Sequence, residues 1–137
     1  MQGKIPTTVS SIYISCPIRG IRVTPEMYGT TAATEIVEQN CKMADELQTK
    51  LKSMFPNATI HNPGNPDLER FVQEAVRSGT LKEKDILNID CNIISNSEFV
   101  IFFNHETLFG RGMLVEYNYV VANNKPFTVI ASITEVR

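Results

Sequence analysis

Short apolar runs alternate along this chain with longer segments of helical periodicity. The short runs cover residues 9–15, 58–61, 99–103 and 126–133, and each has the length and composition of a strand. The longer segments, in which apolar residues recur every three or four positions, cover about residues 31–55, 66–79, 80–94 and 113–124. Strands that alternate with helices imply βαβ units with right-handed crossovers. The pattern therefore predicts an α/β domain with a mostly parallel sheet of four to five strands flanked by helices.

The apolar side chains of three predicted helices gather on one face, which should pack inward. In the first helix this face consists of Ala33, Ile36, Val37, Ala44, Leu47, Leu51 and Met54. In the second it consists of Leu68, Val72, Ala75 and Val76, between a helix-starting Pro66 and a helix-closing Gly79. In the third it consists of Ile86, Ile89, Ile93 and Ile94. Thr80 and Glu83 have the spacing of a capping box, which predicts that the third helix begins there.

Length and charge limit the class of protein. With 137 residues, 42% of them hydrophobic, the chain can bury one good core but is too short for two ordinary domains, so residues 1–137 are expected to form a single domain. The charged fraction is 20% and the formal net charge is −2. This composition does not favour binding to a nucleic-acid polymer or to an anionic membrane. We therefore expect a small-molecule ligand.

The cysteines and the N-terminal segment indicate the compartment. Cys16, Cys41 and Cys91 are odd in number and lack CxxC spacing, which argues against a disulfide framework and against a zinc site. Residues 1–8 lack the apolar core of a signal peptide, and no run approaches the roughly 20 apolar residues of a membrane helix. The sequence thus predicts a cytoplasmic protein with reduced cysteines, no bound metal and no membrane association.

The predicted fold also indicates where a ligand would bind. In a parallel α/β sheet, ligands lie outside the carboxyl ends of the strands. Residues 15–20 follow the first strand, residues 61–66 the second and residues 104–112 the third. We expect these three segments to meet at the ligand site, with the next helix beginning beside it.

Two carboxylates are candidates for chemistry. Asp90 lies on or beside the apolar stripe of its helix, where a carboxylate is costly unless it is paired or functional. Glu116 lies in the first turns of its helix, where backbone N–H groups favour an ionised carboxylate that can attack an anomeric carbon. Structural roles stay open, since Asp90 could cap a loop or pair with an arginine, and Glu116 could only stabilise its helix. Cys16 as a nucleophile would need an activating histidine, and none has a suggestive spacing.

Several motifs, taken in order along the chain, resemble one known family. The first strand and turn read Tyr13-Ile14-Ser15-Cys16-Pro17-Ile18-Arg19-Gly20. Asp90 then precedes the strand of residues 99–103, and a glycine-x-x-x-glutamate motif spans Gly112 to Glu116. The sequence Ala122-Asn123-Asn124-Lys125-Pro126-Phe127 follows. Together these motifs resemble the nucleoside 2-deoxyribosyltransferase family, and most closely its branch of 2'-deoxynucleoside 5'-phosphate N-hydrolases.

The resemblance implies a flavodoxin-like or Rossmann-like fold and an N-glycosidase. The enzyme would hydrolyse the base–sugar bond of (deoxy)nucleoside 5'-monophosphates, without a cofactor and as a homodimer or higher homo-oligomer. Glu116 would attack the anomeric carbon or stabilise positive charge there, while Asp90 orients Glu116 or binds a sugar hydroxyl and Tyr13 supports the glutamate or the sugar. The implied substrate-binding residues are Ser15, Cys16, Pro17, Ile18, Arg19, Gly20, Gly110, Arg111 and Gly112. Of these, Arg19 would bind the 5'-phosphate, since a guanidinium fork suits that group, and Arg111 is a second candidate.

Three other functions stay open. Transfer of deoxyribose between bases is the enzymatic alternative, and the exclusion of water around Glu116 would decide it. A non-catalytic nucleotide-binding or sequestering module would fit the loop before Glu116, which lacks the aspartate typical of the family, so that His105, Glu106 or Arg111 would have to replace it. The same module would fit the end of the sequence at Arg137, before the segment with which relatives complete a neighbouring subunit's site. A protein-interaction domain of this fold would bind no nucleotide.

Overall fold

The computed structural model describes residues 3–106 and 108–136. Four residues lie outside the described part: Met1, Gln2, Thr107 of the predicted loop 104–112, and Arg137, the residue on which the prediction of a missing segment rests.

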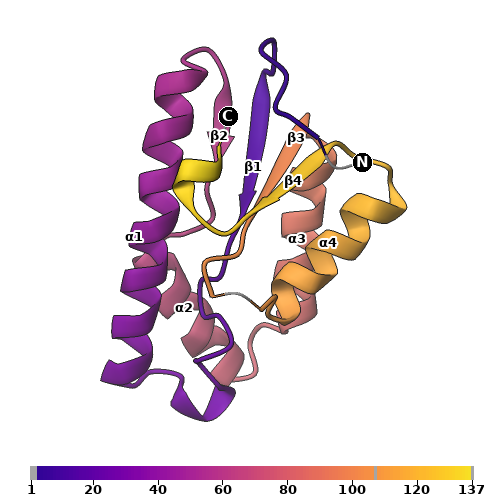
Figure 1. Cartoon of the computed structure of the whole chain (residues 1–137). Coiled ribbons are helices and arrows are strands. Elements are labelled where there is room, and N and C mark those ends of the chain that lie inside the picture. The colour runs from indigo at the N-terminus through magenta and orange to yellow at the C-terminus, as the bar shows by residue number, and fades with distance from the viewer. Residues whose placement is uncertain (1–2, 107, 137) are drawn as a thin grey trace.

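Within the described residues, four strands form one parallel sheet in the order β2-β1-β3-β4 (Figure 1). The strands are β1 (Ser11–Ser15), β2 (Thr59–His61), β3 (Phe99–Phe103) and β4 (Phe127–Ile130). The helices are α1 (Thr31–Met54), α2 (Pro66–Arg77), α3 (Glu83–Ser95) and α4 (Arg111–Ala122), with short 3-10 helices at Pro25–Met27 and Ile133–Glu135. This architecture confirms the predicted flavodoxin-like α/β fold with a parallel sheet of four to five strands.

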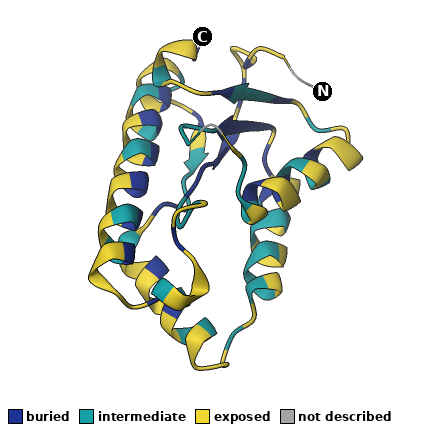
Figure 2. Cartoon of the chain, turned by 60° about the horizontal axis from the view of Figure 1, so that its bottom comes forward, coloured by how far each residue is buried: buried dark blue, intermediate teal, exposed yellow. Residues whose placement is uncertain are grey.

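Helices cover both faces of the sheet, because alternate side chains of a strand point in opposite directions. Ile12 and Ile14 of β1 belong to the same buried cluster as Leu47 of α1. Tyr13, between them, belongs to a second cluster with Val120 of α4. Figure 1 accordingly shows α1 on one side of the sheet and α3 and α4 on the other. In Figure 2 the buried residues of α1 lie on the side of the helix that faces the strands.

The inner position of β3 explains its unbroken apolar sequence. All five of its residues are buried, since helices cover both its faces and strands pair with both its edges. Its neighbour β1 pairs in a register that sets Tyr13 beside Val100 and Ser15 beside Phe102. Tyr13 and Ser15 are two residues apart and therefore point to the same face, towards α4.

The structure corrects the predicted start of the first strand and the predicted end of the last strand. β1 begins at Ser11, two residues later than the apolar pattern predicts, although Val9 is buried. β4 ends at Ile130, and the chain then turns into the 3-10 helix Ile133–Glu135. Apolar character in these segments therefore reflects packing of loop residues against the core as well as strand pairing.

The predicted start of α3 is also wrong. The N-cap residue is Lys82, whose backbone N–H donates to the carboxylate of Asp85 at 3.4 Å. Thr80 precedes the helix, and Glu83 does not act as its capping partner. The carboxylate of Glu83 instead accepts hydrogen bonds from Arg19 and Tyr28. Glu83 therefore pairs with Arg19, which is distant in the sequence, and not with the backbone of Thr80 as the spacing predicts.

The predicted inner faces of α2 and α3 are wrong in part. In α2, Val72, Ala75 and Val76 are half-buried, but Leu68 is 55% exposed, whereas Glu69 and Gln73 are buried. In α3, Ile94 is buried but Ile89 is 58% exposed. The physical reason in α2 is the ion pair between Glu69 and Arg19, which turns the polar side of the helix inward.

A core truncation tests this packing. Leu47 is fully buried between α1 and the sheet, so Leu47→Ala is expected to lower the free energy of unfolding by about 2–5 kcal/mol. Leu68→Ala makes the same chemical change at an exposed site and is expected to change it by less than about 0.5 kcal/mol. Urea denaturation followed by circular dichroism measures both, and equal losses would contradict the assignment of α1 to the core.

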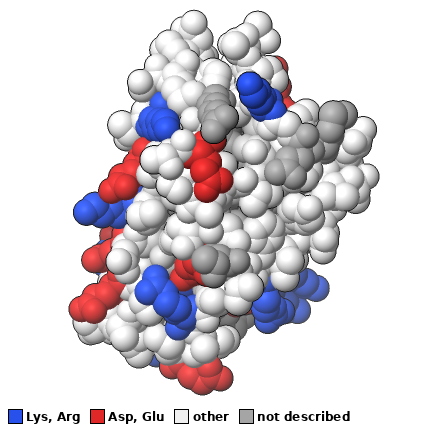
Figure 3. All heavy atoms as spheres, in the orientation of Figure 1, with Lys and Arg blue, Asp and Glu red and all other residues white. Residues whose placement is uncertain are grey.

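The described helices also bear on the membrane prediction. Among the described residues, no helix combines the length and the apolar character that crossing a bilayer requires. On the face shown in Figure 3, acidic and basic side chains are interspersed.

Candidate functional site

A cavity of about 550 Å³ lies beyond the carboxyl end of β1, between α2, α3 and the beginning of α4. The turn after β1 forms one wall, and Pro63 in the turn after β2 contributes to it. The segment that leads into α4 forms another wall, through residues 110–113. The three segments that the strand order predicts to meet therefore do line one cavity.

Glu116 is the most strongly organised side chain of this cavity. It lies on the second turn of α4 and is only 6% exposed. The hydroxyl of Tyr13 donates to its Oε2 at 2.6 Å, and the hydroxyl of Ser15 donates to its Oε1 at 2.8 Å. Because both donors come from one face of β1, the strand holds the two oxygens of the carboxylate in a defined orientation.

The environment of Glu116 makes its charge responsive to pH near neutrality. Burial raises the pKa of Glu116 from its ordinary value of 4.5 to about 7. The hydrogen bonds from Tyr13 and Ser15 oppose this rise because they stabilise the carboxylate, whereas the negative charge of Asp90 adds to it. Burial also raises the pKa of Tyr13 well above its ordinary value, so the phenol stays protonated as a donor.

Asp90 is the second carboxylate of the cavity. It extends from α3 and lines the same space as Glu116. Burial raises the pKa of Asp90 to about 6, and the positive charge of Arg19 opposes the rise. Two carboxylates whose pKa values lie near 6 and 7 share one cavity, which is an arrangement common in catalytic sites.

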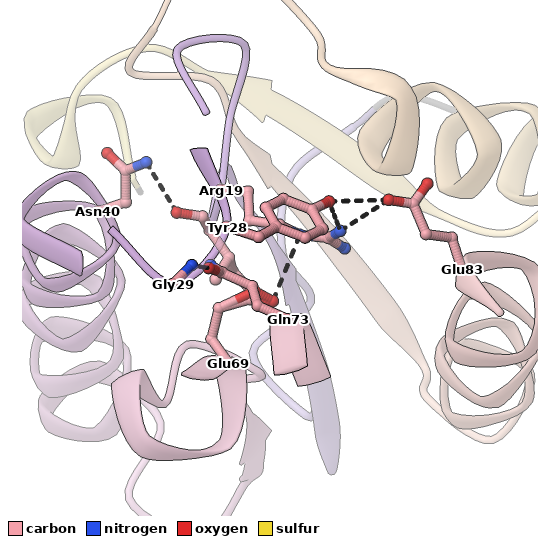
Figure 4. Close-up of polar contacts among 8 residues, drawn as sticks. Arg19, Tyr28, Gly29, Asn40, Glu69, Gln73 and Glu83 are labelled. Carbon is pink, nitrogen blue, oxygen red and sulfur yellow. Dashed lines mark hydrogen bonds and ion pairs between the residues drawn. The ribbon is translucent and has the colours of Figure 1, made fainter. Parts of the chain in front are cut away.

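Arg19 lies between α2 and α3 and contacts side chains from both helices (Figure 4). Its Nε lies 3.3 Å from Oε1 of Glu69, and its Nη1 lies 3.0 Å from Oε1 of Glu83. Nη1 also donates to the hydroxyl of Tyr28 at 2.6 Å, and that hydroxyl donates to Glu83 at 2.8 Å. The guanidinium is thus held by two carboxylates and a phenol.

The turn that carries Arg19 is itself anchored. The side chain of Asn40, fully buried on α1, donates to the carbonyl of Ile18 at 2.9 Å (Figure 4). Gly20 has a φ of +70°, and a side chain at this position would collide with the carboxylate of Glu106. Glu106 also accepts hydrogen bonds from the backbone N–H of Ile21 and from Arg22. The turn is therefore fixed from α1 and from the loop after β3.

The structure brings together nearly all the residues that the sequence proposes for the site. The cavity is lined by Tyr13, Cys16, Pro17, Ile18, Arg19, Gly20, Asp90, Gly110, Arg111, Gly112 and Glu116. Ser15 lies behind them, fully buried against Glu116 rather than on the cavity wall. Of the three loop side chains named above, Arg111 lines this cavity, whereas His105 and Glu106 line a separate hollow of about 440 Å³.

Two further observations bear on the chemistry of the site. Burial, and next the charge of Glu116, raise the pKa of the Cys16 thiol well above its ordinary range, so the thiol stays protonated and unreactive at neutral pH. Among the described residues, no group of three or more histidine, cysteine, aspartate or glutamate side chains is arranged to hold a metal ion.

Sequence reasoning missed Tyr28, Glu69 and the contact of Glu83 with Arg19. Glu69 and Gln73 are four residues apart on α2 and share a helix face, which was a weak signal for a polar inner side. Tyr28 follows a 3-10 helix in a loop with no regular pattern. Since these residues reach the site through the tertiary fold, local spacing could not identify them.

The hydrogen bond from Tyr13 can be tested directly. Tyr13→Phe removes a donor that stabilises the ionised carboxylate, so the pKa of Glu116 is expected to rise further above its wild-type value of about 7. Carboxyl NMR titration of the labelled protein measures this pKa. Tyr119→Phe, on the same helix as Glu116, provides the control. A pKa that is unchanged or lowered in Tyr13→Phe would contradict the assigned geometry.

Comparison with known proteins adds no assignment, since no family model, no curated protein and no solved structure matches this chain.

Proposed function

We propose that this chain is an N-glycosidase that hydrolyses the base–sugar bond of (deoxy)nucleosides or their 5'-monophosphates through Glu116. The observation that supports this most strongly is the buried Glu116 carboxylate, bound at both oxygens by Tyr13 and Ser15 and facing a cavity of about 550 Å³. Cavities of roughly 300–1,000 Å³ are typical of small-molecule sites. The site residues that resemble those of nucleoside 2-deoxyribosyltransferases support the same proposal.

In the proposed reaction the ionised Glu116 acts on the anomeric carbon of the sugar. One carboxylate oxygen forms a bond to this carbon while the bond from the carbon to the base nitrogen breaks, and the base leaves with that electron pair. Water then attacks the anomeric carbon while the bond from this carbon to Glu116 breaks, which releases the sugar and regenerates the carboxylate. The proton that the water loses neutralises the departed base. Because Tyr13 and Ser15 hold Glu116 in place, little reorganisation is needed before attack.

Asp90 contributes to this reaction as an ionised carboxylate. Its pKa of about 6 leaves it mostly ionised at pH 7, and in that state it accepts a hydrogen bond from a sugar hydroxyl. Its negative charge also raises the pKa of Glu116. A carboxylate of higher pKa is a stronger nucleophile, so Asp90 increases the reactivity of the fraction of Glu116 that is ionised.

The experiment that tests the function is base release from a panel of ribo- and deoxyribonucleosides and their 5'-monophosphates, followed by chromatography. Free base and free sugar in equal amounts are expected. Formation of a new nucleoside when an acceptor base is added would identify a deoxyribosyltransferase instead. Binding without release from any substrate would leave a non-catalytic nucleotide-binding module, and no binding at all would favour a protein-interaction domain.

We also propose that the chain acts as a homodimer or higher homo-oligomer. Ile89 on α3 and Leu114, Val115 and Val121 on α4 are exposed apolar side chains, which are characteristic of interfaces when they cluster. Val115 lines the cavity as well, so a second copy on this side would border the site. Light scattering that gives the mass of a single chain would contradict this proposal.

A cytoplasmic location is proposed on the basis of the thiols. Cys16 and Cys41 are buried and Cys91 is half-buried, and all three are free. Free thiols persist in compartments where cellular reductants keep cysteines reduced. Cell fractionation tests the location, and recovery outside the cytoplasm would overturn it.

A further inference from the structure

The guanidinium of Arg19 is already neutralised within the protein. Oε1 of Glu69 on α2 lies 3.3 Å from its Nε, and Oε1 of Glu83 on α3 lies 3.0 Å from its Nη1 (Figure 4). The hydroxyl of Tyr28 also accepts a hydrogen bond from Nη1. A guanidinium that binds phosphate uses its fork of N–H donors and its unbalanced positive charge. In Arg19 the charge is balanced by two carboxylates, and Nε and Nη1 already have acceptors.

Glu69 makes it unfavourable for Arg19 to leave this ion pair and bind a phosphate instead. Its side chain is buried, and burial raises its pKa. The charge of Arg19 opposes that rise most, and a hydrogen bond with Gln73 opposes it next. If Arg19 moved to a phosphate, Glu69 would keep a buried carboxylate without its counter-charge. Breaking a buried ion pair in this way is strongly unfavourable.

The other charges of the cavity also disfavour an anion. Asp90 and Glu116 add two carboxylates to Glu69 and Glu83 on the cavity wall. Lys84 and Arg111 also line the cavity, but both are exposed and their charges are screened by solvent. A phosphate dianion would meet the like charge of these carboxylates, whereas an uncharged 5'-hydroxyl would not.

We propose that Glu69 and Glu83 are specificity-determining residues, which hold Arg19 away from phosphate and make the cavity select nucleosides with a free 5'-hydroxyl over 5'-monophosphates. The inference rests on the proposed N-glycosidase function and narrows its substrate class. It departs from the role of phosphate ligand that the sequence resemblance implies for Arg19. The cavity would thus discriminate by disfavouring the 5'-monophosphate, rather than by making extra contacts to the nucleoside.

The test compares kcat/KM for each nucleoside with kcat/KM for its own 5'-monophosphate. The chains compared are the wild type, Glu69→Gln, Glu83→Gln and the double variant. The wild-type chain is expected to prefer nucleosides by about tenfold or more, and the double variant is expected to reduce that preference by a similar factor. Glutamine keeps the size of the side chain and an acceptor for Arg19 while removing the charge.

Glu74→Gln is the matched control. Glu74 is an exposed glutamate on α2 that pairs with Arg77 at the surface, so its change removes one negative charge from the same helix outside the cavity. Its ratio of nucleoside to monophosphate turnover is expected to equal that of the wild type. A change as large as that of Glu69→Gln would indicate an effect of net charge and would overturn the proposal.

A binding measurement separates this inference from the proposed function. Thermal shifts of Glu116→Gln with a nucleoside and with its monophosphate report selectivity without turnover, because a ligand that binds only the folded state raises the melting temperature. Preference for nucleosides with no turnover in the wild type would support the selectivity while removing the glycosidase. A larger thermal shift of Glu116→Gln with the monophosphate, or no shift with either compound, would overturn the inference.

Discussion

Replacing Glu116 with glutamine is expected to lower the rate of base release by about 10³-fold or more. Glutamine has nearly the same shape and fits between Tyr13 and Ser15, although one of the two hydroxyls must then accept from the amide N–H instead of donating. An amide cannot form the glycosyl–enzyme bond. Chromatography of the released base under single-turnover conditions measures the loss. Substrate affinity is expected to change little, since the size of the cavity is unaffected.

The same variant is expected to have a distinct effect on stability. The pKa of Glu116 rises from 4.5 in the unfolded chain to about 7 in the folded protein, so between these values the folded state binds more protons. Stability of the wild type therefore falls as pH rises through this window. Glu116→Gln removes this loss and is expected to be more stable than the wild type at pH 8 by on the order of 3 kcal/mol, and by much less at pH 4.

Urea denaturation at pH 4, 6 and 8 measures this difference. Glu74→Gln again serves as the control, because its side chain is exposed and its pH dependence should match that of the wild type. Residual base release within about tenfold of the wild type would show that Glu116 is not the nucleophile. A stability difference that does not depend on pH would show that Glu116 does not titrate near neutrality.

Replacing Asp90 with asparagine is expected to lower base release by about 10²-fold, because a charged hydrogen-bond acceptor for the sugar is lost. It is also expected to shift the pH dependence in a defined direction. The negative charge of Asp90 raises the pKa of Glu116, so its removal lowers that pKa. The acid limb of the pH–rate profile, which follows ionisation of Glu116 near pH 7, should therefore move to lower pH.

A pH–rate profile of wild type and Asp90→Asn from pH 4 to 9 provides the measurement. A role confined to packing would lower the rate without moving the acid limb. A shift of the limb to higher pH would contradict the electrostatic coupling of the two carboxylates. Asp67→Asn removes an exposed aspartate on α2 and is expected to leave both rate and profile unchanged.

The position of Glu116 and of the strand that contacts it could largely be predicted from local sequence. Tyr13 and Ser15 are two residues apart on one strand, and the sequence places Glu116 in the first turns of a helix that begins near the expected ligand site. Because strand and helix geometry repeat with fixed periods, residue spacing alone puts the two hydroxyls on one face. Their joint contact with Glu116 nevertheless emerged only from the structure, in which the hydroxyl of Ser15 donates to the Glu116 carboxylate.

Sequence patterns were less informative about helix faces. The apolar stripe of α2 predicts that Leu68 faces inward, yet Leu68 is exposed and Glu69 is buried. Periodicity records which side chains share a face, but the direction of that face depends on what the helix packs against. α2 packs against α1, and its buried Glu69 pairs with Arg19 from the turn after β1.

By itself, the sequence determined the order of strands and helices, the parallel α/β architecture and the set of segments that meet at the carboxyl ends of the strands. These follow from periodicity, chain connectivity and the handedness of βαβ units, which are local or general rules. Only the tertiary structure decided the environment of each charge. Glu69 and Glu83 reach Arg19 from two different helices, and burial sets the pKa values of Asp90 and Glu116. Ion pairing and desolvation depend on distances between groups far apart in the chain, which no local pattern specifies.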